Sequence, residues 1–76
     1  MRQRIIDLAV QYGFKTVLSD SIRFESVVGY IDIGRYIVGY AIGGIAVAQM
    51  RLCRFRVADL KRLEDLILQA QIRAAF

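Results

Sequence analysis

The sequence predicts an α+β domain in which an N-terminal and a C-terminal helix pack on a three-stranded antiparallel meander. Apolar residues recur at helical spacing over residues 2–12 and again over residues 57–75. Between these segments, from Ile22 to about Arg54, β-branched and aromatic residues dominate and glycines punctuate the run. A chain of 76 residues has room for one domain, 1–76. The order α-β-β-β-α is typical of helices lying on one face of a small sheet.

The two helices are predicted from the spacing of their apolar residues. The positions in the first helix are Ile5, Leu8, Ala9 and Tyr12. Gly13 follows where a left-handed residue would end that helix. The positions in the second helix are Leu60, Leu63, Ile67, Ala70 and Ala74. Both stripes predict helices that bury one side against a sheet or another helix.

Three strands are predicted, at residues 22–31, 35–42 and 45–54. Gly43-Gly44 lies between two apolar runs and predicts a two-residue turn, because a type I′ turn needs positive φ at both central positions. Such a turn sets the pairing of the last two strands. The expected pairs are Ile42 with Ile45, Tyr40 with Val47, Val38 with Gln49 and Tyr36 with Arg51.

With this register both faces of the sheet are apolar. One face has small residues at its centre, among them Gly39 and Ala41, and we assign it to the helices because small side chains allow close approach. The other face carries Ile31, Val27, Tyr36, Val38, Tyr40, Ile42, Ile45 and Val47. An antiparallel sheet with one solvated face normally alternates apolar and polar residues. We therefore expect a partner protein or a second copy of the chain to cover this face, unless one helix covers each face.

Composition argues against catalysis and against cofactors. The chain has no histidine, and Cys53 is its only cysteine. An intrachain disulfide, an ordinary zinc site and a cysteine–histidine nucleophile are therefore excluded, and Cys53 is expected to be a small buried residue at the end of a strand. The carboxylates are scattered, and no glycine-rich phosphate loop is present. The sequence predicts a protein that is not an enzyme.

The lone cysteine and the absence of a secretory leader favour the cytoplasm. Membrane association is disfavoured. Residues 36–50 carry no charge, but as a helix they would extend only about 22 Å. The hydrocarbon core of a bilayer is thicker, at about 30 Å. A hairpin at Gly43-Gly44 explains the same residues better.

A basic cluster supports nucleic-acid binding as the alternative function. The net charge is +4. The cluster comprises Arg51, Arg54, Arg56, Lys61 and Arg62. Tyr36 is expected opposite Arg51, and arginine beside an exposed tyrosine can track and stack on a nucleic-acid strand. The cluster matches no nucleic-acid-binding motif, and it equally suits the rim of a protein interface, where arginine is enriched.

The sequence therefore favours a non-enzymatic protein–protein binding module, such as a regulator or inhibitor that occupies a partner's surface. A homodimer is the simplest form, because a self-complementary patch closes with two-fold symmetry. The expected interface residues are Tyr36, Val38, Tyr40, Val47 and Gln49. The expected basic rim is Arg35, Arg51, Arg54 and Arg56.

Overall fold

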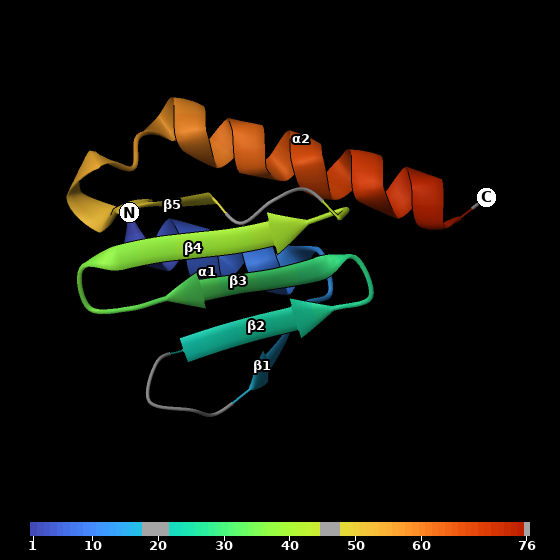
Figure 1. Cartoon of the computed structure of the whole chain (residues 1–76), viewed down its shortest axis with the longest axis horizontal. Helices are drawn as coiled ribbons and strands as arrows, with labels where there is room; N and C mark the ends of the chain where they lie inside the picture. Colours follow the sequence, from blue (N-terminus) through green and yellow to red (C-terminus); the bar gives the residue numbers. More distant parts are fainter. Residues whose placement is uncertain (18–21, 45–47, 76) are drawn as a thin grey trace.

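The computed structural model describes residues 1–17, 22–44 and 48–75 and has two layers, a sheet and a pair of helices (Figure 1). The sheet is an antiparallel meander in the order β1-β2-β3-β4-β5. The elements in chain order are α1 (Arg2–Gln11), β1 (Lys15–Val17), β2 (Ile22–Ser26), β3 (Gly29–Ile33), β4 (Ile37–Ile42), β5 (Ala48–Arg51), the 3₁₀ turn η1 (Leu52–Arg54) and α2 (Val57–Ala74). Within these described ranges, no helix combines the length and apolar character that crossing a bilayer requires.

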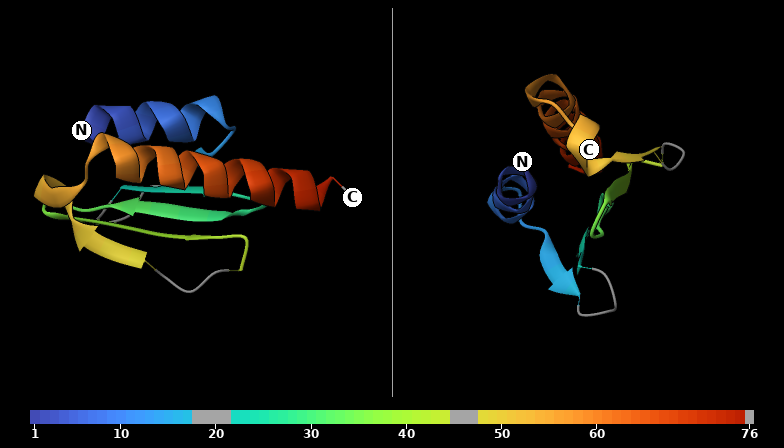
Figure 2. Two further views of the ribbon diagram at one scale, coloured as in Figure 1. Left: turned by 90° about the horizontal axis from the view of Figure 1, so that it is seen from above. Right: turned by 90° about the vertical axis from the view of Figure 1, so that its left-hand side faces the viewer.

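Both helices lie on the same face of the sheet, as Figure 2 shows from above and from one end. The predicted α+β class and both helices are confirmed. The prediction of three strands is wrong, because the described part of the chain forms a sheet of five. One additional strand is β1, which follows Gly13 and pairs with β2.

The other additional strand arises because the segment predicted as one strand, 22–31, contains a hairpin turn. Ser26 pairs with Gly29, and Val27-Val28 form the turn between β2 and β3. Gly29 has φ +149°, and a Cβ at this position would overlap the carbonyl oxygen of Ala41. Two valines are poor turn residues, so the glycine supplies the conformational freedom that the turn needs.

The register of β4 and β5 differs by one residue from the prediction. Tyr40 pairs with Ala48 and Val38 with Met50, whereas Val47 and Gln49 were expected. Gly43 and Gly44 do have positive φ, at +66° and +77°. The predicted Ile42–Ile45 pair lies outside the described residues. Because side chains alternate between the faces of a sheet, a shift of one residue moves every β5 side chain to the other face.

The predicted assignment of the two faces is also wrong, because the helices cover the face with the large side chains and not the face with the small ones. The covered face carries the large apolar side chains, and its buried members are Phe24, Ile31, Ile33, Val38 and Ile42. The small residues Gly39 and Ala41 lie on the open face, where they were not expected. Large β-branched side chains fill the space beneath two helices better than small ones, and burial of apolar surface is the main stabilising contribution.

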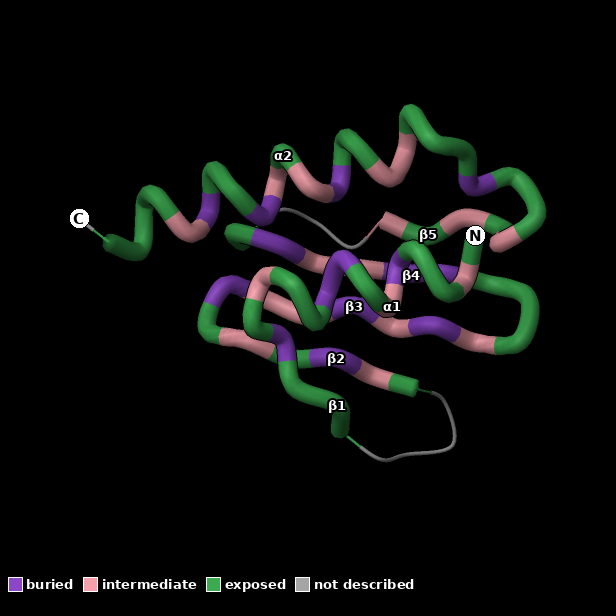
Figure 3. Tube along the Cα trace, turned by 180° about the vertical axis from the view of Figure 1, so that it is seen from behind, coloured by how far each residue is buried: buried purple, intermediate pink, exposed green. Residues whose placement is uncertain are grey.

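The core forms between the covered face and the inner sides of the helices (Figure 3). The helices contribute Ile5, Leu8, Ala9, Leu63, Ile67 and Ala70. The hydroxyl of Tyr12 donates to Glu64 Oε2 at 2.9 Å, and Gln71 Nε2 donates to the Tyr12 carbonyl at 3.0 Å. These two contacts join the end of α1 to the middle and to the last turn of α2.

Candidate functional site

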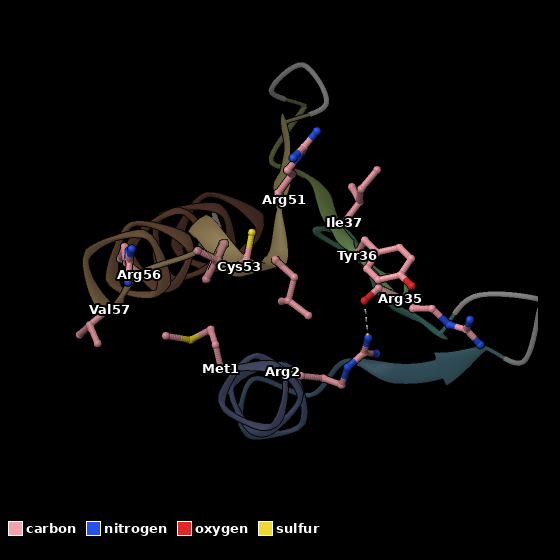
Figure 4. A pocket seen from close by; sticks show the side chains of 11 residues that line it. Met1, Arg2, Arg35, Tyr36, Ile37, Arg51, Cys53, Arg56 and Val57 are labelled. Carbon is pink, nitrogen blue, oxygen red and sulfur yellow. Dashed lines mark hydrogen bonds between the residues drawn. The ribbon is translucent and has the colours of Figure 1, made fainter.

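A cleft of about 980 Å³ opens at the end of the molecule where the chain starts (Figure 4). Four elements meet there: the start of α1, the β3–β4 connection, the end of β5 with η1, and the start of α2. We call it the arginine cleft, because Arg2, Arg35, Arg51 and Arg56 surround it. Its other lining residues are Met1, Tyr36, Ile37, Leu52, Cys53, Phe55 and Val57.

The connection from β5 to α2 holds two of the arginines in place. Arg51 ends β5, and η1 then turns the chain toward α2. Phe55 is buried beneath this turn, and its N–H donates to the Leu52 carbonyl at 3.1 Å. The N–H of Arg56 donates to Asp59 Oδ2 at 2.8 Å, which caps α2. A buried aromatic ring and a capped helix start therefore fix the backbone of Arg51 and Arg56.

Arg2 closes the opposite wall of the cleft. Its Nη2 donates to the carbonyl of Gly34 at 2.6 Å and to that of Arg35 at 3.3 Å. These bonds tie the first turn of α1 to the connection between β3 and β4, 32 residues further along the chain. They also hold the backbone of Arg35 at the rim.

The cleft is electropositive because its arginines are not neutralised. Among the described residues that line it, none is Asp or Glu. The guanidinium groups of Arg35, Arg51 and Arg56 form no ion pair with any carboxylate of the described chain, and all three residues are exposed. An uncompensated group of like charges raises the local concentration of anions.

Outside the cleft, Arg23 and Arg62 have acidic partners, whereas Arg4, Arg54 and Arg73 form no ion pair within the described residues. Arg23 on the open face contacts Asp32 through two hydrogen bonds of 2.7 and 2.8 Å and lies 3.6 Å from Glu25. The hydrogen bonds with Asp32 raise the pKa of Arg23, with burial acting against them. Arg62 lies 3.6 Å from Asp59.

The shape of the arginine cleft suits an extended ligand. In Figure 4, Arg35, Arg51 and Arg56 project from different sides of the opening and do not converge on one point. The apolar side chains of Ile37, Leu52 and Phe55 line the space between them. This arrangement can hold several negative charges spaced along a chain, together with an apolar group between them.

The residues predicted for the interface are separated in the structure. Tyr36 is 72% exposed and lines the cleft. Gln49 is exposed on the open face, where its Cγ lies over Gly39. Val38 is fully buried and Tyr40 half-buried on the covered face, so the prediction that they lie on the uncovered face is wrong. Val47 lies outside the described residues.

The predicted basic rim is largely brought together. Arg35, Arg51 and Arg56 line the cleft, whereas Arg54 is exposed outside it. The wider cluster that suggested nucleic-acid binding is divided. Lys61 lines a separate groove between the two helices, which also contains Glu64. That part of the predicted cluster therefore lies apart from the cleft.

Two further features of the cleft differ from expectation or were missed. Cys53 was expected to be buried, but it is exposed, because η1 turns the chain outward directly after β5. Arg2 and Val57 were not identified as site residues. Their positions depend on how the start of each helix docks, and no local pattern signals this. Ile37 could have been identified only with the correct assignment of the sheet faces.

No protein-family model matches the chain, and no curated protein or solved structure matches it either.

Proposed function

We propose that the protein is a non-enzymatic binding module whose arginine cleft holds an acidic segment of a partner protein. The observation that supports the proposal is the cleft itself: four arginines and no carboxylate around an apolar floor. Arginine and exposed tyrosine are the residue types that most often anchor protein interfaces. A module of this kind acts as a regulator or inhibitor by occupying the segment that it binds.

Binding of single-stranded nucleic acid is the second candidate, favoured by the position of exposed Tyr36 next to Arg35 at the rim. Nucleic-acid grooves stack successive bases on several aromatic side chains. Here the floor between the arginines is mainly aliphatic, with Ile37, Leu52 and Val57, and the only other aromatic ring, Phe55, is buried. These features favour the acidic protein segment.

The test is fluorescence anisotropy with three labelled probes. The first is a peptide of about ten residues, mostly glutamate with two central leucines. The second has glutamine in place of every glutamate, and the third is oligothymidine of equal charge. We expect the acidic peptide to bind and the glutamine peptide to bind at least about tenfold more weakly, because charge-assisted contacts are lost.

Two double variants with the same net charge locate the site. Arg51→Glu/Arg56→Glu reverses charge inside the cleft, and we expect a loss of at least about tenfold in affinity for the acidic peptide. Lys15→Glu/Lys61→Glu makes the same change at two exposed residues outside it and should cost less than about threefold. Equal losses in both variants would reduce the proposal to nonspecific attraction. Tight, steeply salt-dependent binding of oligothymidine without peptide binding would support the nucleic-acid alternative.

Self-association stays a prediction. The sequence predicts it from an apolar sheet face that the helices leave uncovered. In the structure this face lies beneath the helices, so it does not support self-association. The mass in solution by light scattering measures it directly.

A further inference from the structure

We infer that the acidic segment binds as a sixth β-strand along the outer edge of β5, beneath α2, with its end in the arginine cleft. The inference rests on the proposed function and specifies how that ligand is held. Strand addition gives affinity through main-chain hydrogen bonds and specificity through alternate side chains.

The hydrogen-bond pattern shows which backbone groups of β5 are free. The N–H of Leu52 donates to the Tyr36 carbonyl at 2.7 Å, so residues 36 and 52 form a hydrogen-bonded pair. Such pairs alternate along an antiparallel ladder. Residues 48 and 50 therefore also direct their backbone groups toward β4, whereas Gln49 and Arg51 direct theirs away from it.

The other side of β4 agrees with this assignment. The N–H of Gly34 donates to the Ile37 carbonyl at 2.8 Å, and that of Gly43 donates to the Val28 carbonyl at 2.8 Å. The odd-numbered residues of β4 thus bond to β3, which leaves the even-numbered ones for β5. Since β5 is the last strand in the order of the described sheet, Gln49 and Arg51 offer two N–H and two C=O groups to an added strand.

Helix α2 provides a roof for that strand. In the face-on view of Figure 1, α2 lies beyond the outer edge of β5, and Figure 2 shows it in the helix layer above the sheet. Val57, Leu60, Lys61 and Glu64 face the groove toward α1. With 3.6 residues per turn, the opposite flank carries Arg62, Leu66, Gln69 and Arg73, on the side of the β5 edge. This flank offers an apolar contact from Leu66 and the cationic group of Arg73, together with that of Arg62, which lies 3.6 Å from Asp59.

The positive charge near the β5 edge favours an acidic strand over a second copy of the chain as the partner of this edge. A second copy pairing edge to edge would bring two equally basic edges together, each with Arg51 and Arg56 at one end, which is unfavourable. An acidic strand would instead place carboxylates near these arginines and apolar residues toward Leu66. The β1 edge lacks this character, since the pocket beside it contains Lys15 and Glu25 and no arginine.

Alternate N-methylation of the acidic peptide tests the inference. A methyl group on an amide that faces β5 removes a donor and blocks pairing, whereas one on an amide that faces away does neither. Two peptides are methylated at every second residue, one at odd and one at even positions. We expect one of them to lose at least about tenfold in affinity and the other to stay within about threefold.

The protein side is tested with Gln49→Pro, which removes an outward N–H without breaking the β4–β5 ladder. We expect at least about a tenfold loss of peptide affinity with little change in melting temperature. Peptide should also slow hydrogen exchange at the amides of Gln49 and Arg51. If Gln49→Pro does not fold, the comparison of the two N-methylated peptides still tests strand addition.

The outcomes separate the two proposals. If both methylated peptides bind like the parent while Arg51→Glu/Arg56→Glu still abolishes binding, strand addition is wrong and the cleft proposal stands. If the parent peptide does not bind in an arginine-dependent way, both fail. Slow exchange at Gln49 and Arg51 in the free protein, together with a dimeric mass, would assign the edge to a second copy and overturn the inference.

Discussion

The two faces of the sheet are built from neighbouring residues of the same strands, yet their chemistry is opposite. On the covered face Ile31, Ile33 and Ile42 are at most 1% exposed. On the open face Arg23 pairs with Asp32, and its guanidinium carbon lies 4.2 Å from the centre of the Tyr30 ring. Apolar and polar residues thus alternate in β2 and β3, as expected for a sheet with one solvated face. The alternation of apolar and polar residues can therefore be recognised in the sequence only when the strand limits and the register are assigned correctly.

The strongest test of this comparison uses one substitution on both faces of β4. Ile42 is 1% exposed and Ile37 is 50% exposed. We expect Ile42→Ala to lower the free energy of unfolding by about 2–5 kcal/mol, because it leaves a cavity in the core. Ile37→Ala should cost less than about 1 kcal/mol. Urea denaturation measures both, and equal costs would contradict the assignment of the faces.

The two tyrosines of the predicted interface extend the comparison to charge. Tyr40→Asp places a carboxylate on the covered face, and we expect a loss of about 1–3 kcal/mol in unfolding free energy. Tyr36→Asp changes an exposed residue and should stay within about 0.5 kcal/mol. If Tyr40 lay on an uncovered face, as expected from the sequence, the fold would tolerate both substitutions. Thermal unfolding of the two variants distinguishes these cases.

Substitution of Gly29 tests whether a change at the turn between β2 and β3 lowers the unfolding free energy as much as a change in the core. We expect Gly29→Ala to cost about 1–3 kcal/mol, because φ +149° is strained for alanine and the methyl group would meet the Ala41 carbonyl. Gly44→Ala is the matched control, since it also has positive φ but nothing lies within 4 Å of its Cβ position. A smaller loss at Gly29 than at Gly44 would contradict the close approach of β3 and β4.

The smallest expected effect concerns the contact between the helices that roof the covered face. The hydrogen bond to Glu64 raises the pKa of Tyr12, with burial and the negative charges of Glu64 and Asp65 adding to it. The contact therefore stabilises the fold below the ordinary tyrosine pKa and is lost as the pH rises through the raised value. From pH 9 to 11 the wild type should lose more stability than Tyr12→Phe. Parallel losses in urea titrations would contradict the contact.

Helical periodicity and turn chemistry could be predicted from the sequence, whereas long-range docking could not. Both helices and the positive φ of Gly43 and Gly44 followed from local patterns. The Val27-Val28 turn has no local signal, so one strand was predicted where the structure has two. The register of β5 depended on loop length, and one residue reversed its faces. Val38 and Tyr40 were wrongly expected at an interface because the helices were assigned to the face with Gly39 and Ala41.

For the site, the local sequence was informative and the tertiary contacts were not. Arg51 and Arg56 are five residues apart, and the expected change from strand to helix between them already suggested a basic rim. Arg35 was expected at the same rim. Arg2 joins them only through its bonds to the carbonyls of Gly34 and Arg35, more than 30 residues away in the chain. No periodicity or motif reports such a contact.

The meander order of the sheet has a kinetic consequence. Every described strand pairs only with its neighbours in the chain, so each hairpin closes a short loop and can form early. The contact of Tyr12 with Glu64 spans 52 residues and must wait until the helices dock. We therefore expect substitutions at the helix–helix contact to accelerate unfolding with little change in the refolding rate, and substitutions in the β3–β4 hairpin to slow refolding.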